Sequence, residues 1–295
     1  MKTTSFASTA TARFPKTRTL ALALTVFLAA TLFAVTASAQ PLVYVVTSNQ
    51  QFGTVNLATG AFQQIGPATP EGQANLVWAP DGTLFSLTFS GNLEKIDPMT
   101  GATTVVGPTG LGYNAFDLAG FAGRLYATDF SNNLYSVNPR TGAATLLLAT
   151  GIPPDPSIPF STNPDGTINL CEETLYNVGG KLYATFDAFT LDPNSLAATP
   201  KVSPALYQID PFTGAATFVA FTDLNLGATV AANGQFYAFK WETLAFTEFG
   251  PQVQSLIVSL DLSSGKTSPS ASVDPAAGGI TGAAPVRSQR GTARE

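Results

Sequence analysis

The sequence predicts an all-β fold, a five-bladed β-propeller of four-stranded antiparallel blades, and three observations support it. A short turn motif recurs five times along the chain, and a hydrophobic–aromatic pair recurs five times between these turns. Segments of alternating apolar and polar residues flank both, which is typical of half-buried β-strands. Four short strands repeated about every 40 residues are typical of propeller blades.

Each copy of the turn motif begins with Asp or Asn and ends with Gly, and Pro stands second in three of them. The Asp or Asn side chain can bond to the following backbone, Pro presets φ for a type I turn, and Gly takes the left-handed conformation that closes a bulged hairpin. The motif therefore joins two antiparallel strands, C and D. Its copies are residues 56–60, 97–101, 138–142, 210–214 and 261–265.

The hydrophobic–aromatic pair marks a strand B in each unit, and an inner strand A fits before it, at 75–79 in unit two and 116–120 in unit three. The pairs end at Tyr44, Phe85, Tyr126, Tyr183 and Tyr237. The first unit has no strand A of its own. The same offset from Gly265 predicts that 280–284 supplies this strand and closes the ring, which removes two open sheet edges. A β-solenoid or open array is the alternative, but it does not explain the closing strand.

The spacing of the turn glycines, 41, 41, 72 and 51 residues, shows where the repeat is interrupted. Measured from the aromatic markers, the extra residues fall into three insertions, none long enough for a blade. They are 149–167 between strands D and A, and 187–203 and 240–252 between strands B and C. These connections leave a blade at the same end, so we expect all three insertions as loops on one face of blades four and five. Insertions on one face often mark a binding face, although surface loops also tolerate insertion at little cost.

Residues 1–39 have the pattern of a secretory signal peptide. Four basic residues precede an apolar run from Leu20 to Val35, and Ala37-Ser38-Ala39 fits a cleavage site. We expect cleavage before Gln40, a propeller over 40–286 with no transmembrane segment, a disordered tail over 287–295, and a secreted or periplasmic location. An uncleaved membrane anchor is the alternative.

Cleavage leaves ten basic and 19 acidic residues, so the formal net charge falls from −5 to −9. An acidic surface repels phosphate groups, so we expect no nucleic-acid partner. We expect a monomer whose partner is an unknown extracellular glycan or protein. Cys171 is the one cysteine, which excludes an internal disulfide.

The chain has no histidine, which excludes Ser-His-Asp triads, Cys-His pairs and His-ligated zinc. No catalytic or metal-binding constellation is predicted, and no cofactor, although carboxylates, amides and aromatics remain. The candidate ligand-binding residues lie in or beside the insertions: Asp165, Glu172, Glu173, Asp187, Trp241 and Glu242.

Glu172 and Glu173 are predicted at the upper end of inner strand A in blade four, at positions equivalent to Ala74 and Asn75. A carboxylate facing the channel is costly unless it is paired, bound to a cation or solvated by ordered water. The oxygen-rich segment 163–169 suggests Ca²⁺ as a possible ligand, but it lacks the full spacing of a calcium loop.

The segment 42–48 and the Leu-Tyr-x-Ile-Asp-Pro-x-Thr-Gly segment ending at Gly214 resemble secreted bacterial β-propellers with YVTN-type or PQQ-like repeats. The resemblance spans about residues 42–265 and rests on residues that build blades. It implies the fold and leaves the function open, because such folds host many activities.

Three functions remain open. The first is an exported, non-catalytic binding module of the cell envelope that uses the inserted face of blades four and five. The second is a carboxylate-based glycan hydrolase or lyase, which needs two carboxyl groups about 5–10 Å apart, such as Glu173 with Asp187 or Asp165. The third is a purely structural cell-surface protein.

Overall fold

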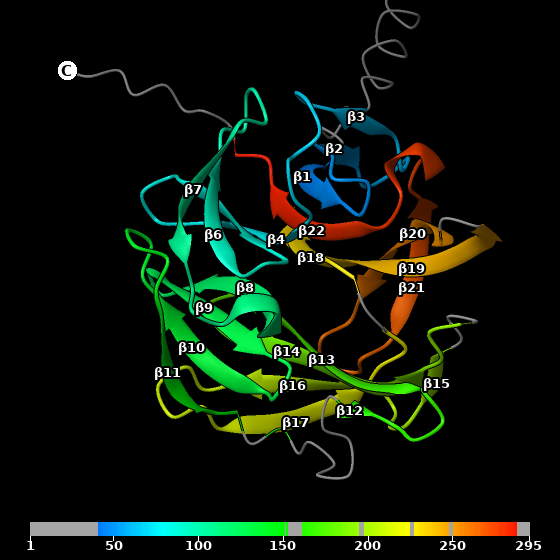
Figure 1. Ribbon diagram of the computed structural model, residues 1–295. Coiled ribbons are helices and arrows are strands. Elements are labelled where there is room, and N and C mark those ends of the chain that lie inside the picture. The colour runs from blue at the N-terminus through cyan, green and yellow to red at the C-terminus, as the bar shows by residue number, and fades with distance from the viewer. Residues whose placement is uncertain are drawn as a thin grey trace, which may run out of the picture. The chain divides into compact units, whose positions relative to one another are not determined.

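The computed structural model describes residues 41–150, 152, 161–194, 198–224, 227–247 and 250–287, and these form five antiparallel sheets arranged in a ring (Figure 1). The predicted signal peptide, 1–39, and residues 288–295 of the predicted tail lie outside the described residues. The innermost strands, A, are β22 (Ile280–Pro285), β4 (Gln73–Trp78), β8 (Ala115–Phe121), β13 (Ile168–Val178) and β18 (Thr229–Ala232). Each of them contacts the next around the centre of the ring.

The other three strands of each blade follow in chain order, as predicted. Strands B are β1 (Leu42–Thr47), β5 (Leu84–Thr88), β9 (Arg124–Asp129), β14 (Lys181–Leu191) and β19 (Gln235–Thr247). Strands C are β2 (Phe52–Asn56), β6 (Asn92–Ile96), β10 (Asn133–Val137), β16 (Ala205–Ile209) and β20 (Gly250–Leu260). Strands D are β3 (Phe62–Gln64), β7 (Thr103–Pro108), β11 (Ala144–Ala149), β17 (Ala216–Phe221) and β21 (Thr267–Ser272).

The ring is closed by the last described strand, which confirms the prediction for 280–284. Strand β22 pairs antiparallel with β1, with Tyr44 opposite Ala284 and Val43 opposite Pro285. Ile280 is fully buried and Ala284 is 1% exposed. The first blade is therefore built from both ends of the propeller.

The recurring turn motif forms the C–D turns as predicted. In every copy the first side chain accepts a hydrogen bond from the amide two residues later, as Asp97 does from Met99 at 2.8 Å. Every closing glycine has a left-handed φ of 69–80°. The same glycines also lie against the preceding blade. A Cβ on Gly60 would stand 1.7 Å from the Ser272 carbonyl oxygen, so a side chain fits neither the backbone conformation nor the space.

The marker pairs fill the interfaces between blades. The first residue of each pair packs against the preceding blade and the second against the following one, because neighbouring strand residues point to opposite faces. Leu125, for example, packs with blade two and Tyr126 with blade four. The buried residues accordingly form one hydrophobic cluster at each of the five interfaces. Burying each large apolar side chain contributes about 1.5–3 kcal/mol.

Parts of the insertions are strand, whereas the sequence predicted loops. Strand β14 continues to Leu191 and pairs there with β15 (Ala198–Pro200), while β12 (Ser161–Thr162) pairs with the start of β13. Blade four therefore has six strands. In blade five, the pairing of β19 with β20 extends the B–C hairpin as far as Thr247 opposite Gly250. These strand segments extend the ladders of blades four and five beyond the length found in the regular blades.

Candidate functional site

The centre of the ring holds two cavities, one toward each face of the propeller. A polar contact between Asn75 on β4 and Asp117 on β8 lies between them: Asn75 lines both cavities, whereas Asp117 lines only the one on the side of the B–C connections. We call this second cavity the mouth pocket and the first the rear pocket.

The Asp117 carboxylate ties three blades together. Its Oδ1 accepts hydrogen bonds from the Asn75 side-chain amide of blade two and from the Leu118 amide, at 2.7 Å. Its Oδ2 accepts a hydrogen bond from the Leu175 amide of blade four, at 2.6 Å. Since a carboxylate has about four lone-pair sites, three donors leave room for one further donor.

Asn75 reaches Asp117 because β4 contains a bulge. The register with β5 shifts between Ala74 and Leu76, and Asn75 has a left-handed φ of 53°. Asn tolerates this conformation better than most residues, and its Oδ1 accepts from the Leu76 amide at 2.7 Å. Its Nδ2 also donates to the Leu118 carbonyl at 2.7 Å. A matching bulge in β8, between Ala115 and Asp117, turns Asp117 toward it.

Burial raises the pKa of the Asp117 carboxyl from the ordinary value of 3.8 to about 7, against the lowering effect of its hydrogen bonds from Asn75, Leu118 and Leu175. The side chain is 4% exposed. The three donors are neutral, so they stabilise the carboxylate without supplying a positive charge. Desolvation therefore outweighs hydrogen bonding, and the group changes charge near neutral pH.

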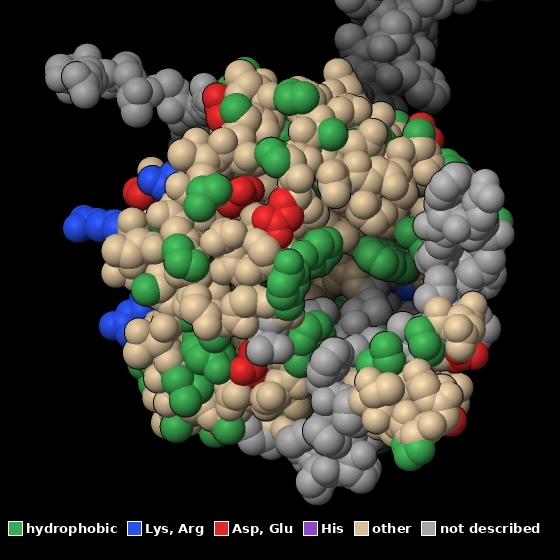
Figure 2. Space-filling model, in the orientation of Figure 1, with side chains coloured by type: hydrophobic (Ala, Val, Ile, Leu, Met, Phe, Trp, Pro, Cys, Tyr) green, Lys and Arg blue, Asp and Glu red, His purple; other side chains and the backbone are tan. Residues whose placement is uncertain are grey.

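The mouth pocket has a volume of about 320 Å³ and a mainly apolar lining. Residues of every blade contribute, and aromatic side chains come from three of them: Phe89, Tyr113, Phe130 and Trp241. Tyr113 belongs to the short 3₁₀ turn η1 (Gly112–Asn114) and is 79% exposed, and Phe89 is 47% exposed. In Figure 2 this face is hollowed near its centre, and hydrophobic side chains gather beside the hollow.

Trp241 is fixed as one wall of the mouth pocket. Its indole Nε1 donates to the Ile280 carbonyl at 2.8 Å, and its ring lies over Gly279. A Cβ on Gly279 would stand 2.7 Å from Cε2 of the indole. The absence of a side chain at Gly279 is what admits the ring.

We expect Gly279→Ala to displace the Trp241 indole and to destabilise the fold by about 1–3 kcal/mol, as overpacking does. Thermal unfolding and tryptophan emission measure the two effects, with Trp241→Phe as the second mutation of a double-mutant cycle. The smaller ring removes the contact, so the substitution at Gly279 should cost less in that background. Equal costs in both backgrounds would show that the indole does not set the requirement for glycine.

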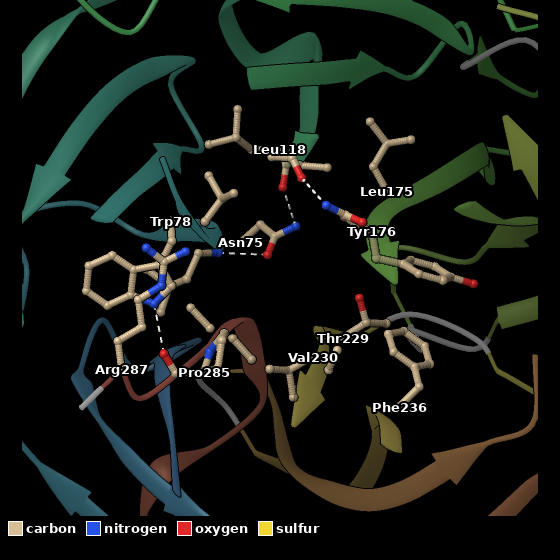
Figure 3. Close-up of a pocket in the computed structure, with 18 residues that line it drawn as sticks. Asn75, Trp78, Leu118, Leu175, Tyr176, Thr229, Val230, Phe236, Pro285 and Arg287 are labelled. Atoms are coloured by element: carbon tan, nitrogen blue, oxygen red, sulfur yellow. Dashed lines mark hydrogen bonds between the residues drawn. The ribbon is translucent and has the colours of Figure 1, made fainter. Parts of the chain in front are cut away.

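The rear pocket, drawn in Figure 3, has a volume of about 180 Å³. The Arg287 guanidinium lies over the Trp78 ring, 4.8 Å from the ring centroid, and the Trp78 indole donates to the Pro285 carbonyl at 2.8 Å. Arg287 is the first residue of the predicted tail. The buried Oγ1 of Thr229 has no hydrogen-bond partner among the described residues. Three aromatic residues, Trp78, Tyr176 and Phe236, are also among its described lining, and Tyr176 and Phe236 are buried.

Of the six predicted ligand-binding residues, Trp241 alone lies among the described lining of the mouth pocket. Glu242, the next residue on β19, is exposed, and Gln254 donates to its carboxylate at 3.4 Å. Asp165 lies in an exposed turn, where its Oδ1 accepts from the Thr167 hydroxyl at 2.6 Å and the Thr167 amide at 3.0 Å. These bonds, the hydroxyl's first, lower the pKa of Asp165.

Asp187 lies on β14 and is 6% exposed, and its Oδ1 has no hydrogen-bond partner among the described residues. Burial raises the pKa of this carboxyl. Glu172 pairs with Asp187, and Glu173 with Phe186, in the β13–β14 ladder. The side chains of Glu172 and Glu173 lie outside the described residues.

The predicted equivalence of Glu172 and Glu173 with Ala74 and Asn75 is off by two positions. Relative to the aromatic marker, the residue of β13 that pairs at the level of Ala74 is Thr174. Counting along the sequence assumed that the inner strands of all blades have the same number of residues. Strand β13 has no bulge, however, so it has no counterpart of Asn75.

Among the described residues, no group of three or more Asp, Glu or Cys is placed to hold a metal ion. Ca²⁺ binding therefore remains a sequence-based expectation. No described helix is long and apolar enough to span a membrane.

Sequence reasoning missed Asp117 and the aromatic rim of Phe89, Tyr113 and Phe130. Asp117 stood inside the predicted strand 116–120, and an acidic residue in an inner strand was the available signal. Attention to the insertions led away from it. No known protein family model matches the chain, and no curated protein is significantly similar to it.

Proposed function

We propose that the protein is an exported binding propeller that takes a small, largely apolar ligand into the mouth pocket. The observation that carries the proposal is the pocket itself, an apolar cavity with four aromatic side chains around a polar floor of Asn75 and Asp117. Ligand sites are typically concave, apolar and of about 300–1,000 Å³, with a few polar groups that orient the ligand. The proposal places the ligand at the channel mouth rather than along all three insertions.

Removing an exposed aromatic from the rim tests the proposal without disturbing the core. We expect Tyr113→Ser to weaken binding of 2-phenylethanol by about two- to twelvefold, because stacking with a ring contributes about 0.5–1.5 kcal/mol. The measurement is an NMR titration at millimolar probe concentrations, the range expected for a fragment with so few atoms.

Phe212→Ser is the matched control, since Phe212 is 75% exposed and stands in a C–D turn, away from the mouth pocket. Its titration should match that of the wild type. If the wild-type protein binds no 2-phenylethanol, or if both variants bind it equally well, the mouth pocket is not the site.

Export is supported by the pattern of residues 1–39 alone. We expect the protein purified from the medium or the periplasm to begin at Gln40, which intact mass spectrometry measures. A product that retains residues 1–39 would contradict cleavage and favour an anchored protein.

The hydrolase hypothesis requires two carboxyl groups facing one bond. Asp117 is the one carboxylate among the described residues that line the mouth pocket, and Asp165 lines a separate outer groove with Asn163 and Lys201. No described pair therefore favours this hypothesis over binding. A purely structural protein predicts no binding in the titration above.

A further inference from the structure

The mouth pocket has one charged group among its described lining residues, and nothing there balances its charge. No Lys or Arg is among them. The donors to Asp117, from Asn75, Leu118 and Leu175, are neutral amides. A buried carboxylate of this kind is stabilised most by a cation that also excludes water.

Among the residues that the structure describes, the charged groups on the neighbouring strands do not supply that cation. Asp129 on β9 is occupied by Tyr135 and Asn133, whose side chains donate to its Oδ2 at 2.8 and 3.0 Å. On β19, Lys240 immediately precedes Trp241, so its side chain leaves the opposite face of the strand. On β13, the two residues that immediately precede Thr174 are acidic, Glu172 and Glu173.

The aromatic rim favours the same kind of ligand. Phe89, Tyr113, Phe130 and Trp241 line the cavity whose floor includes Asp117. The faces of aromatic rings attract ammonium groups, by about 0.5–2 kcal/mol for each well-placed ring. The predicted net charge of the mature chain, −9, adds a long-range attraction for cations.

We propose that the ligand is an organic cation, an apolar body with a protonated amine, whose ammonium group lies among the rim aromatics and donates to Asp117. This inference rests on the proposed function. The apolar part fills the cavity, and the ammonium takes the acceptor site of the carboxylate that Asn75, Leu118 and Leu175 leave open.

Two probes that share a phenylethyl body separate the charge from the pocket. The experiment measures the Kd of 2-phenylethylammonium and of 2-phenylethanol for the propeller chain, residues 40–295, by NMR titration at pH 8 and pH 5. We expect the ammonium compound to bind about tenfold tighter at pH 8, because charge-assisted hydrogen bonds are stronger than neutral ones. This advantage should shrink at pH 5, where Asp117 is protonated, while binding of the alcohol stays constant.

Two variants identify the carboxylate responsible. Asp117→Asn should abolish the preference for the ammonium compound and retain binding of the alcohol. Glu242→Gln removes one negative charge from an exposed position outside the pocket and should preserve the preference. If Asp117→Asn does not fold, the test is whether the wild-type protein loses its preference for the ammonium compound between pH 8 and pH 5.

Equal affinity of the two probes at pH 8, or tighter binding of the alcohol, would overturn the organic cation while leaving the proposed function standing. Failure of both probes to bind would overturn the binding function itself. A preference for the ammonium compound that survives in Asp117→Asn would also overturn the inference, since the charge would then be recognised elsewhere.

Discussion

A chain that ends at Gly279 should lose cooperative unfolding and aggregate at room temperature. It lacks β22, so β1 presents an unpaired edge at the surface of the first blade. The core loses the buried residues Ile280, Ala283 and Ala284. Their packing partners Val43 and Val45 become exposed to solvent. Domain stability is typically only about 5–15 kcal/mol, and the lost ladder and core contacts are of that order. Circular dichroism during heating measures the loss.

A chain that ends at Arg287 retains β22 and is the length control. A circular permutant gives the sharper control, with 280–286 placed before Leu42 through a short turn. Pro285 lies opposite Val43, so this connection makes a β-hairpin that preserves every pairing of the first blade. The permutant should unfold at nearly the wild-type temperature. If it proves as unstable as the truncated chain, the position of the chain end, rather than the missing strand, is responsible.

The ring itself was predictable because its signals are local. The turn motif, Asp or Asn followed four residues later by Gly, specifies a turn independently of its surroundings. The marker pairs identify strand B, because their two residues pack on its opposite faces. Counting from one turn to the next then located every blade. The same count located the closing strand, 280–284.

The floor of the site was not predictable, because it depends on bulges. One extra residue in an inner strand reverses which side chains face the channel. The bulges at Asn75 and before Asp117 bring these two side chains together, whereas β13 has none. No turn motif or alternation in the sequence marks these positions. Equal-length counting therefore pointed to Glu172 and Glu173.

The insertions illustrate a second limit. Residues 187–203 and 240–252 interrupt the period, which indicated loops, but part of each segment continues a strand of its blade. A longer spacing shows where extra residues are, and it does not show whether they join the sheet. Trp241, one of the candidate ligand-binding residues, nevertheless lines the mouth pocket.

We expect the wild-type protein to be more stable than Asp117→Asn in acid, and this advantage to be smaller at neutral pH. The pKa of Asp117 is raised to about 7 in the folded protein, from an ordinary 3.8 in the unfolded chain. Between these values the folded state holds a proton that the unfolded state has lost. Its contribution to stability is therefore greatest below pH 4 and declines as the pH rises to about 7, by on the order of 4 kcal/mol.

Asparagine at this position removes the titration but keeps one acceptor. The Leu175 amide then faces an NH₂ group instead of Oδ2, and an unsatisfied buried donor costs about 1–3 kcal/mol at every pH. The free energy of unfolding of the wild-type protein should therefore exceed that of the variant most at about pH 4, and the difference should narrow or reverse by pH 8. Urea unfolding of both proteins at several pH values measures this difference.

Comparing the unfolding free energies of the two proteins at each pH isolates the effect of Asp117, because both proteins contain all the other carboxyl groups. Burial also raises the pKa of Glu94 and Asp187, whereas the turn hydrogen bonds, the Ser263 hydroxyl's first, lower that of Asp261 to about 2. Asp261→Asn is thus a control of opposite sign, because the stabilising effect of Asp261 is lost as the pH falls toward 2. A wild-type advantage over Asp117→Asn that is constant from pH 4 to pH 8 would show that this carboxyl keeps its ordinary pKa. That result would contradict a buried, uncompensated negative charge at the floor of the mouth pocket.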